Sequence, residues 1–364
     1  MDGKLKGVNM FSFVVLSMTS IRLITLPTDI VQYAKTDAWL SVLLLGFLSI
    51  INGYIFYYIA SKYPNLNFIQ INIKVLGKVM GKATALCICI YVFITNGLSL
   101  RLFSNSIKVF LLDKTPSIII VLVFIGACAY CMLKGIKTIS IFFDIFLPVI
   151  LILTITLLLL PYKNADIKNL LPVLHNGLKP VIAGSLQMID PAIGCAIIAY
   201  IMPYFEDIKA TKKWIFLGIG VAIGFYFLMI TMCIMVIGVN EIQYLNYPSV
   251  ALTKAVQLKA EVFERTESLY MATWIPNALT TIVVYYIAST MCIKEIFNTK
   301  KTKPVILVQL PFFIAISLFP HNTVELQNYL QINNMLAIFL NLIYLPIFFF
   351  VVWLKNRGES KHAQ

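Results

Sequence analysis

The stretch "MTSIRLITLPTDI", residues 18–30, puts a charged residue and a helix-breaking residue inside an apolar run. Pro27 lacks the backbone N–H that an interior helical position requires, and Arg22 is costly at membrane depth unless it has a partner. If this run lies in a membrane, an interrupted helix exposes backbone polar groups that are tolerated only where they line a cavity or meet a ligand. The stretch therefore predicts a broken helix with a site at the break.

The composition indicates that this run does lie in a membrane. Of the 364 residues, 60% are hydrophobic and 12% are charged, whereas soluble domains are about a quarter charged. Apolar runs of about 17 to 25 residues recur along the chain, and each is long enough as a helix to cross a hydrocarbon layer of roughly 30 Å. Continuous runs favour helices over the alternating strands of a barrel. We expect an all-α integral membrane protein with one membrane domain over residues 1–364.

Ten transmembrane helices are expected, of which the first and the sixth are interrupted. The expected spans are Val8–Gln32, Trp39–Ile59, Ala83–Leu111, Pro116–Leu133, Thr138–Leu160, Val181–Pro203, Trp214–Val239, Leu269–Ile293, Pro304–Phe319 and Met335–Leu354.

Basic residues predict which side of the membrane each connector faces. With both termini in the cytoplasm, 18 Lys and Arg fall on the inner side and 9 on the outer side. This excess follows the positive-inside rule, and it accounts for the net charge of +13 without a nucleic-acid partner. The outer connector at residues 247–267 has apolar residues at helical spacing, so we expect it to lie along the membrane interface.

A second interruption is predicted five spans after the first. The segment "GSLQMIDPAIG", residues 184–194, again combines a proline, small residues and one ionisable group, Asp190. Ten helices divide into halves at residues 8–160 and 181–354, so the pattern predicts a five-plus-five inverted repeat, LeuT-like, with discontinuous helices 1 and 6.

Polar stripes mark two further equivalent helices. The third span carries Tyr91, Thr95 and Ser99, and the eighth carries Thr273, Asn277, Thr281, Tyr285 and Ser289. Four-residue spacing puts each set on one helix face. Such residues either line a common interior space or hydrogen-bond neighbouring helices together. The candidate ligand-binding residues are Thr19, Ser20, Ile21, Arg22, Tyr91, Thr95, Gln187, Asp190, Asn277 and Thr281.

Arg22 and Asp190 are expected to form an ion pair. At 1.5 Å per residue their depths differ by about 6 Å, which is within the reach of an arginine side chain. The alternative is that each finds water or backbone carbonyls by itself. Asp144 either reaches the cytoplasm or forms an ion or proton site. Arg101 either faces the interior or packs against carbonyls, and Asp29 is expected to reach water.

The sequence contains no signature of an enzyme or of a bound metal. HExxH and GxSxG are absent, and three histidines are too few for a metal site. We expect no catalytic residue, no metal and no cofactor.

At these residues the chain resembles the germinant permease family, the B subunits of GerA-type spore germination receptors, within the amino acid/polyamine/organocation transporter superfamily. The resemblance rests on "ITLP" at 24–27, "NLLPVLHNGLKPVIAGS" at 169–185 and "FERTESLYMATW" at 263–274. Family members often carry Gly-x-Gly at the first break, where bare amides can hold a carboxylate. Here Ser20, Ile21 and Arg22 match those positions, so Arg22 either binds an acid group or plugs the pocket by pairing with Asp190.

The resemblance implies a germinant-sensing subunit in the spore inner membrane. It implies binding of a small germinant, commonly an amino acid, and assembly in the lipid bilayer with a larger membrane A subunit and a lipoprotein C subunit. The alternative function is a proton- or sodium-coupled secondary transporter of amino acids, because the same pocket would serve both roles.

Overall fold

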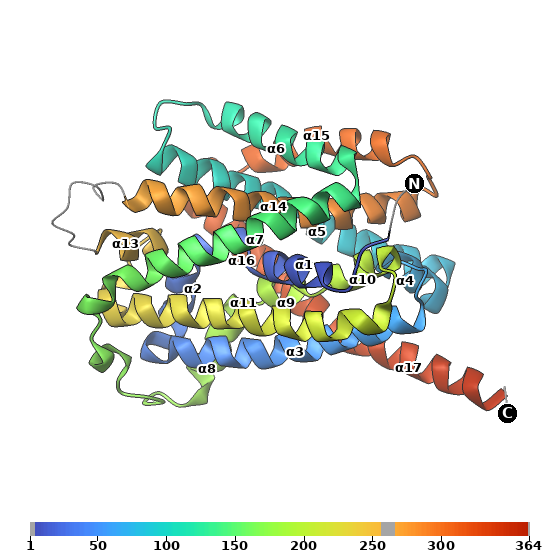
Figure 1. Cartoon of the computed structure of the whole chain (residues 1–364), viewed down its shortest axis with the longest axis horizontal. Coiled ribbons are helices and arrows are strands. Elements are labelled where there is room, and N and C mark those ends of the chain that lie inside the picture. The colour runs from blue at the N-terminus through green and yellow to red at the C-terminus, as the bar shows by residue number, and fades with distance from the viewer. Residues whose placement is uncertain (1–3, 256–265, 363–364) are drawn as a thin grey trace.

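The protein is a single bundle of helices. The structure is a computed structural model that describes residues 4–255 and 266–362. Within these ranges the only β-type pairing is one isolated bridge, between Leu5 and Phe205. Most helices run along the long axis of the molecule, and the first described residues and the end of the last helix lie at the same end (Figure 1).

The helices, in chain order, have the following bounds. They are α1 Asn9–Met18, η1 Ile21–Ile24, α2 Leu26–Ala34, η2 Lys35–Asp37, α3 Ala38–Lys62, α4 Phe68–Leu76, α5 Lys78–Phe110, α6 Ser117–Lys134, α7 Ile136–Leu159, η3 Leu160–Asn164, η4 Ile167–Leu170, α8 Leu178–Gln187, α9 Asp190–Gly194, α10 Ile197–Ile201, η5 Met202–Tyr204, α11 Ile208–Ile237, α12 Val239–Ile242, α13 Pro248–Lys254, α14 Thr266–Ile296, α15 Thr302–Leu318, α16 Thr323–Ile338, the π-helical η7 Phe339–Tyr344 and α17 Leu345–His362.

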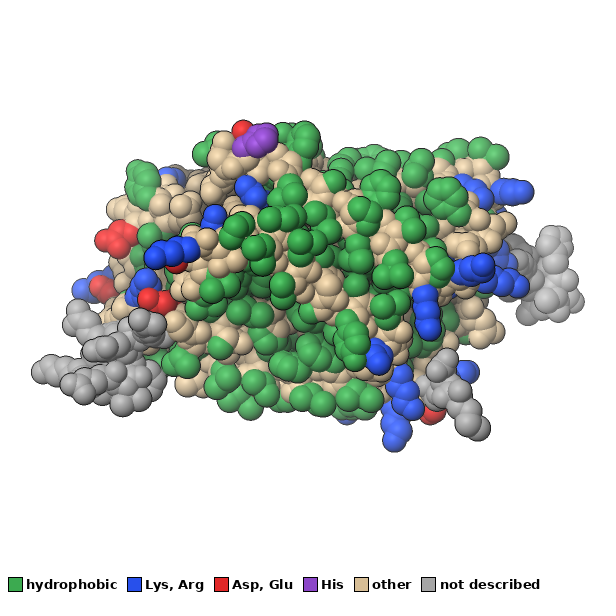
Figure 2. Space-filling model, turned by 90° about the horizontal axis from the view of Figure 1, so that it is seen from above, with side chains coloured by type: hydrophobic (Ala, Val, Ile, Leu, Met, Phe, Trp, Pro, Cys, Tyr) green, Lys and Arg blue, Asp and Glu red, His purple; other side chains and the backbone are tan. Residues whose placement is uncertain are grey.

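Length and composition allow the bundle to cross a membrane. Among the described residues, seven helices are long and apolar enough to do so, and a bent pair formed by α8 and the segment Asp190–Tyr204 makes up to eight. α1 and α15 are apolar but shorter, so the number of ten crossings stays a prediction. Apolar side chains cover the middle of the surface, while Lys and Arg lie toward both ends and are mixed with Asp and Glu mainly at the end away from the chain termini (Figure 2).

The first predicted interruption is present between α1 and α2. α1 ends at Met18, and the backbone is non-helical at Thr19 and extended at Ser20. The Ser20 side chain accepts a hydrogen bond from the Arg22 amide and so caps η1. Pro27 lies in the first turn of α2, where a missing N–H costs nothing because that N–H would have no helical partner.

The second predicted interruption is present between α8 and α9. α8 ends at Gln187, and α9 begins at Asp190 with Pro191 in its first turn. The two parts of this span are bent by 50°. Discontinuity of both predicted helices is therefore confirmed, whereas the division into two inverted halves stays a prediction.

Two connectors and one span differ from the sequence-based expectation. The connector between the second and third expected spans contains α4, whose start is closed by a capping box between Asn67 and Gln70. The last span begins at Thr323 rather than Met335. Its first half is polar and packs on α5, so hydropathy alone did not identify it as part of the span. In the outer connector α13 covers Pro248–Lys254, and residues 256–265 lie outside the described part of the chain.

Close backbone packing brings the two broken helices together. A β-carbon on Gly194 of α9 would lie 2.6 Å from the Ser17 carbonyl oxygen of α1, and one on Gly184 of α8 would lie 2.7 Å from the Ser41 hydroxyl. Real atoms do not approach so closely, so a side chain at Gly194 would push the two backbones apart. Contact at this distance requires glycine.

Replacing Gly194 by alanine is therefore expected to destabilise the protein. Overpacking of this kind costs about 1–3 kcal/mol, so the thermal midpoint of the detergent-solubilised G194A protein should fall. Gly220 on α11 has open space around it, and G220A serves as the matched control that keeps the native midpoint. Equal midpoints for the two variants would contradict the close approach of α1 and α9.

Candidate ligand site at the broken helices

Arg22 joins the two interruptions through a pair of carboxylates. Its Nη1 lies 2.9 Å from Oδ2 of Asp190, and its Nη2 lies 2.9 Å from Oδ2 of Asp29. The side chains of Arg22 and Asp190 are 11% and 8% exposed, and that of Asp29 is 25% exposed. The predicted Arg22–Asp190 pair is confirmed. The expectation that Asp29 simply reaches water is wrong, because α2 turns this carboxylate back toward η1.

The planar guanidinium suits this role. Two separate N–H edges let one cation hold carboxylates from two elements, which a lysine ammonium does with less directional control. Because a buried charge without a partner costs several kcal/mol, each of the three groups stabilises the placement of the other two. Arg22 thus ties the start of α9 to the first turn of α2.

Protein side chains satisfy the main-chain groups at the first break. The Tyr226 hydroxyl donates to the Met18 carbonyl at 2.8 Å and accepts from the Ser20 amide at 3.0 Å. The Trp274 indole donates to the Ile21 carbonyl at 3.2 Å. The expectation of bare main-chain dipoles at the break is therefore wrong for these groups, because α11 and α14 supply partners from outside the broken helix.

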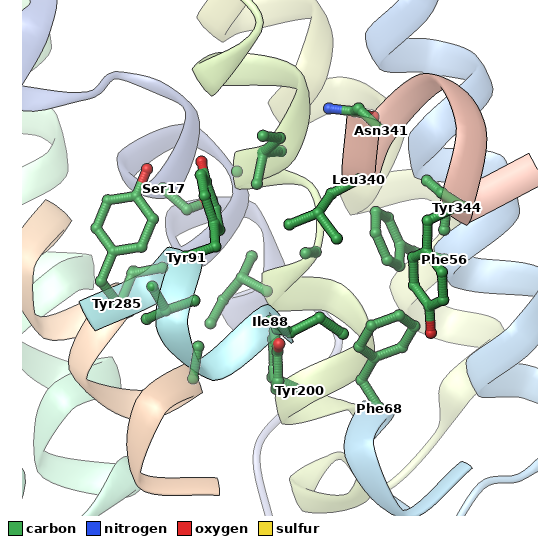
Figure 3. A pocket seen from close by; sticks show the side chains of 18 residues that line it. Ser17, Phe56, Phe68, Ile88, Tyr91, Tyr200, Tyr285, Leu340, Asn341 and Tyr344 are labelled. Atoms are coloured by element: carbon green, nitrogen blue, oxygen red, sulfur yellow. The ribbon is translucent and has the colours of Figure 1, made fainter. Parts of the chain in front are cut away.

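A largely apolar cavity, here called the tyrosine pocket, lies beside the two breaks. Ser17 of α1 and Gly194 of α9 contribute to its wall, so both broken helices reach it. The space between its walls, including the part open to solvent, is about 690 Å³. Aromatic side chains surround it (Figure 3). Its lining residues are Ser17, Phe56, Phe68, Ile88, Tyr91, Val92, Ile193, Gly194, Ala196, Ile197, Tyr200, Val284, Tyr285, Ala288, Leu340, Asn341, Tyr344 and Leu345.

Two polar groups in this apolar wall have unused hydrogen-bonding capacity. The buried Tyr91 hydroxyl neighbours that of Tyr285 and makes no hydrogen bond of ordinary geometry among the described residues. Asn341 accepts from Asn52 at 2.5 Å, but its own Nδ2 is buried without an acceptor in the described chain. Buried polar groups are rarely left unpaired. A ligand that offers an acceptor to each would satisfy both.

The π-helical segment η7 positions Asn341. Single π-helical turns inside α-helices are frequent at functional sites because they shift the side chains that follow. Here the π turn covers Phe339–Tyr344, and three of its residues, Leu340, Asn341 and Tyr344, face the tyrosine pocket. The Tyr344 hydroxyl donates to Asn72 Oδ1 at 2.6 Å, which anchors the turn to α4.

A second, polar cavity lies farther along the bundle and is called the arginine pocket. Arg22, Asp29 and Gln187 line it together with Leu102 and Asn105 of α5. Tyr91 of the same continuous helix lines the tyrosine pocket, and the 11 residues from Tyr91 to Leu102 span about 16 Å along a helix. The two cavities thus lie at different levels along the bundle, and Arg22 lines only the arginine pocket.

The predicted ligand-binding residues do not surround one cavity. Tyr91 lines the tyrosine pocket, whereas Arg22 and Gln187 line the arginine pocket. The Thr19 hydroxyl donates to Asn277 Oδ1 at 3.1 Å, in a small space between α1, α7 and α14. The remaining predicted residues contact other parts of the protein. The Thr95 hydroxyl accepts a hydrogen bond from Asn333, and the Thr281 hydroxyl donates one to the Asn277 carbonyl. Ser20 and Ile21 form hydrogen bonds through their backbones, and Asp190 pairs with Arg22.

The other intramembrane charges also find protein partners. Half-buried Asp144 on α7 accepts from Asn9 Nδ2 at 2.6 Å and from the Ser12 hydroxyl, both on α1. It therefore links the two helices, and its role as an ion or proton site stays a prediction. Arg101 donates to the His321 carbonyl at 3.3 Å, which agrees with the alternative of packing against backbone carbonyls.

Sequence reasoning missed most of the tyrosine pocket. Phe68 comes from the unpredicted helix α4, and Tyr200 and Phe56 give no polar signal in an apolar span. Asn341 was detectable in principle, since a lone amide in "FLNLIY", residues 339–344, is unusual in a lipid-facing run.

Comparisons with known proteins agree on one family. The model of the family described as "Spore germination protein" matches residues 4–326. Among curated relatives from Bacillus subtilis, spore germination protein A2 is 29% identical over 98% of both chains. Spore germination protein YndE is 27% identical over 84% of both chains, and spore germination protein B2 is 24% identical over 96% of this chain and 95% of its own.

Solved transporter structures share the fold. One is Mhp1, a nucleobase-cation-symport-1 family transporter, solved in a closed conformation with bromovinylhydantoin bound. It matches with a TM-score of 0.68 and 12% sequence identity, over 93% of this chain and 76% of its own. The manganese transporter of Eremococcus coleocola, solved as a mutant, matches with a TM-score of 0.66 and 14% identity, over 94% of this chain and 78% of its own. At these identities the likeness describes the fold alone, and the predicted LeuT-like fold class is confirmed.

Removing Arg22 should destabilise the protein more than removing Asp29. R22M leaves buried Asp190 without its cation, a loss of about 3–5 kcal/mol for a buried pair, whereas D29N removes a partner that is partly solvated. The R22M/D190N double variant should lose less stability than the sum of the two single changes. Thermal midpoints of the purified variants measure this, and additive losses would show that the two groups do not interact.

Tyr226→Phe should also lower stability, because it removes the hydroxyl that donates to the Met18 carbonyl and accepts from the Ser20 amide, and leaves these two groups only the 2.9 Å hydrogen bond between themselves. Each lost hydrogen bond of this kind costs about 0.5–1.5 kcal/mol. Tyr130 on α6 is 62% exposed, so Y130F is the control that keeps the native thermal midpoint. An unchanged midpoint in Y226F would indicate that the break does not depend on this hydroxyl.

Proposed function

This chain belongs to the spore germination protein family, and from that premise we propose that it senses a small germinant, an amino acid, and signals its presence to partner subunits. The membership agrees with the resemblance drawn from the sequence motifs. At the coarser level the chain is a germinant receptor-like membrane protein with a transporter fold. We further propose that the ligand is an amino acid and that its binding is signalled to A and C subunits. The proposal also places the chain in the spore inner membrane, with both termini in the cytoplasm.

The observation that carries the proposal is the tyrosine pocket at the meeting point of both broken helices. A ligand there touches Ser17 of α1 and Gly194 of α9 at once. These are the two elements that pack backbone to backbone, and Arg22 and Asp190 tie the adjoining segments together. A ligand shifts a conformational equilibrium only by binding one arrangement better than the other. A pocket shared by two separate broken helices meets that requirement.

The lining of the pocket favours an amino acid with an apolar side chain. Its walls are mainly aliphatic and aromatic, which suits a hydrocarbon group, and its unpaired polar atoms suit a carboxylate. In this proposal the Tyr91 hydroxyl and the Asn341 amide donate to the carboxylate. The Ser20 amide already donates to the Tyr226 hydroxyl and so is not free to bind a carboxylate. The two side chains would therefore take the role that bare amides would have in a Gly-x-Gly break.

The alternative function is coupled amino acid transport, and the fold shared with two transporters favours it. The same pocket would then be reached in turn from each end of the bundle. Asp144, which connects α7 to α1, is the candidate group for a proton or a cation. In neither function does the chain act as an enzyme.

A thermal-shift screen of the purified chain against amino acids, nucleosides and sugars tests the ligand class. We expect an amino acid to raise the melting midpoint, and N341L to lose that shift because it removes a hydrogen-bond donor from the pocket. N356L is the matched control, since Asn356 on α17 lies outside the pocket. A shift that survives in N341L would contradict this pocket, and shifts only with sugars or nucleosides would contradict the ligand class.

Uptake of labelled amino acid into proteoliposomes separates the two functions. A sensor should bind the amino acid without gradient-driven accumulation, and spores that lack the chain should fail to germinate with it. Robust coupled uptake together with normal germination of the deletion strain would favour the transporter instead.

A further inference from the structure

A third cavity, distinct from the two described above, is lined by lysines and is called the lysine pocket. It lies where the N-terminal segment, the corner between α6 and α7, the end of α14 and the start of α15 meet. It is open, and the space between its walls, including the part open to solvent, is about 1300 Å³. In Figure 2, Lys and Arg side chains gather at this end of the molecule. Its polar lining residues are Lys4, Lys134, Lys137, Tyr204, Lys294 and Thr302, with Thr290 at its apolar wall.

The charge in this pocket is uncompensated. Four of its lining residues are lysines and, within the described chain, no Asp or Glu lines it. None of the four forms an ion pair among the described residues. Glu206 and Asp207 follow Tyr204 closely in sequence and Glu295 follows Lys294, but none of these carboxylates forms an ion pair with the four lysines among the described residues. Four ammonium groups around one cavity repel each other unless an anion lies between them.

The wall of the pocket is apolar. Met132, Ile136 and Met291 face it beneath the lysines. The helices that form its corner continue into the membrane-facing surface, where Tyr130 is 62% exposed and Ile145 is 60% exposed. A cationic rim above an apolar wall at the end of lipid-facing helices suits an amphiphile with an anionic head.

We propose that the lysine pocket binds the phosphate head group of an anionic phospholipid, with Lys134, Lys137 and Lys294 around the phosphate and an acyl chain along the wall. Dispersed basic residues near a membrane need only an attraction to its surface, whereas these four line a single hollow. The Lys134 ammonium also lies 5.0 Å from the centre of the Tyr130 ring, on the side of the lipid-facing helices. Lys294 is positioned for the task, because its ammonium donates to the Thr302 hydroxyl at 2.9 Å and joins α14 to α15.

A bound lipid would brace the segments that lead into both broken helices. The Leu5 amide donates to the Tyr204 carbonyl at 2.8 Å, and the Glu206 amide donates to the Leu5 carbonyl at 3.1 Å. Leu5 and Tyr204 also line the lysine pocket. Occupation of the pocket would therefore hold the segment that precedes α1 against η5. This inference does not depend on which ligand the tyrosine pocket takes.

Native mass spectrometry of the purified chain with phosphatidylglycerol tests the proposal. The triple variant K134Q/K137Q/K294Q should retain on the order of 100-fold less lipid than the native chain, since about 1 kcal/mol per lysine near an anionic head group is roughly fivefold for each of the three. The control K78Q/K209Q/K300Q removes the same charge from exposed lysines outside the pocket and should retain lipid normally. Equal losses in both variants would overturn the site, since the attraction would then follow net charge alone.

Two further arms distinguish the sources of the phosphate and guard against misfolding. Phosphatidylcholine should bind weakly, and inorganic phosphate should fail to raise the melting midpoint at concentrations where phosphatidylglycerol does. Stabilisation by inorganic phosphate equal to that by the lipid would overturn the lipid assignment.

If the triple variant does not fold, K137Q alone, at an exposed residue, should still lower lipid retention measurably, and normal retention would contradict the proposal.

Discussion

One buried guanidinium holds the centre of this protein together. Arg22 lies at the first break of the chain and reaches Asp190 at the second break and Asp29 on the helix that follows. A charge at this depth has few stable arrangements, because it must keep partners in every state that the protein visits. The trio therefore restricts how the segments around the two breaks can move relative to each other. It also explains why a charged residue and a broken helix occur together.

The main chain at the first break already has its hydrogen-bond partners within the protein. Tyr226, Trp274 and Ser249 already supply partners to the main chain between Met18 and Leu23. The available space and the unpaired polar atoms lie beside the breaks, in the tyrosine pocket. The chain thus combines the interrupted helices of a transporter fold with a first break whose main-chain groups are already hydrogen-bonded to protein side chains. Under the proposed function, recognition in this site would depend on side chains of neighbouring helices more than on exposed backbone.

Local chemistry predicted the features that depend on single stretches, and missed those that depend on tertiary packing. Each break could be predicted from a proline and a charged residue in one apolar stretch, Pro27 with Arg22 and Pro191 with Asp190. The ion pair could be predicted because the two charged residues lie at similar depths in the membrane. Asp29 was missed as a partner because its direction depends on how α2 leaves η1. Hydropathy placed the last helix too late, since its polar first half is buried by α5 rather than by lipid.

An electron cryo-microscopy map of the chain in lipid nanodiscs would test the central claim most directly. The account predicts that helical density stops at Met18 and again at Gln187, with density of the Arg22 side chain continuous to both carboxylates. Unbroken first and sixth spans, or Arg22 and Asp190 facing lipid on opposite flanks, would contradict it.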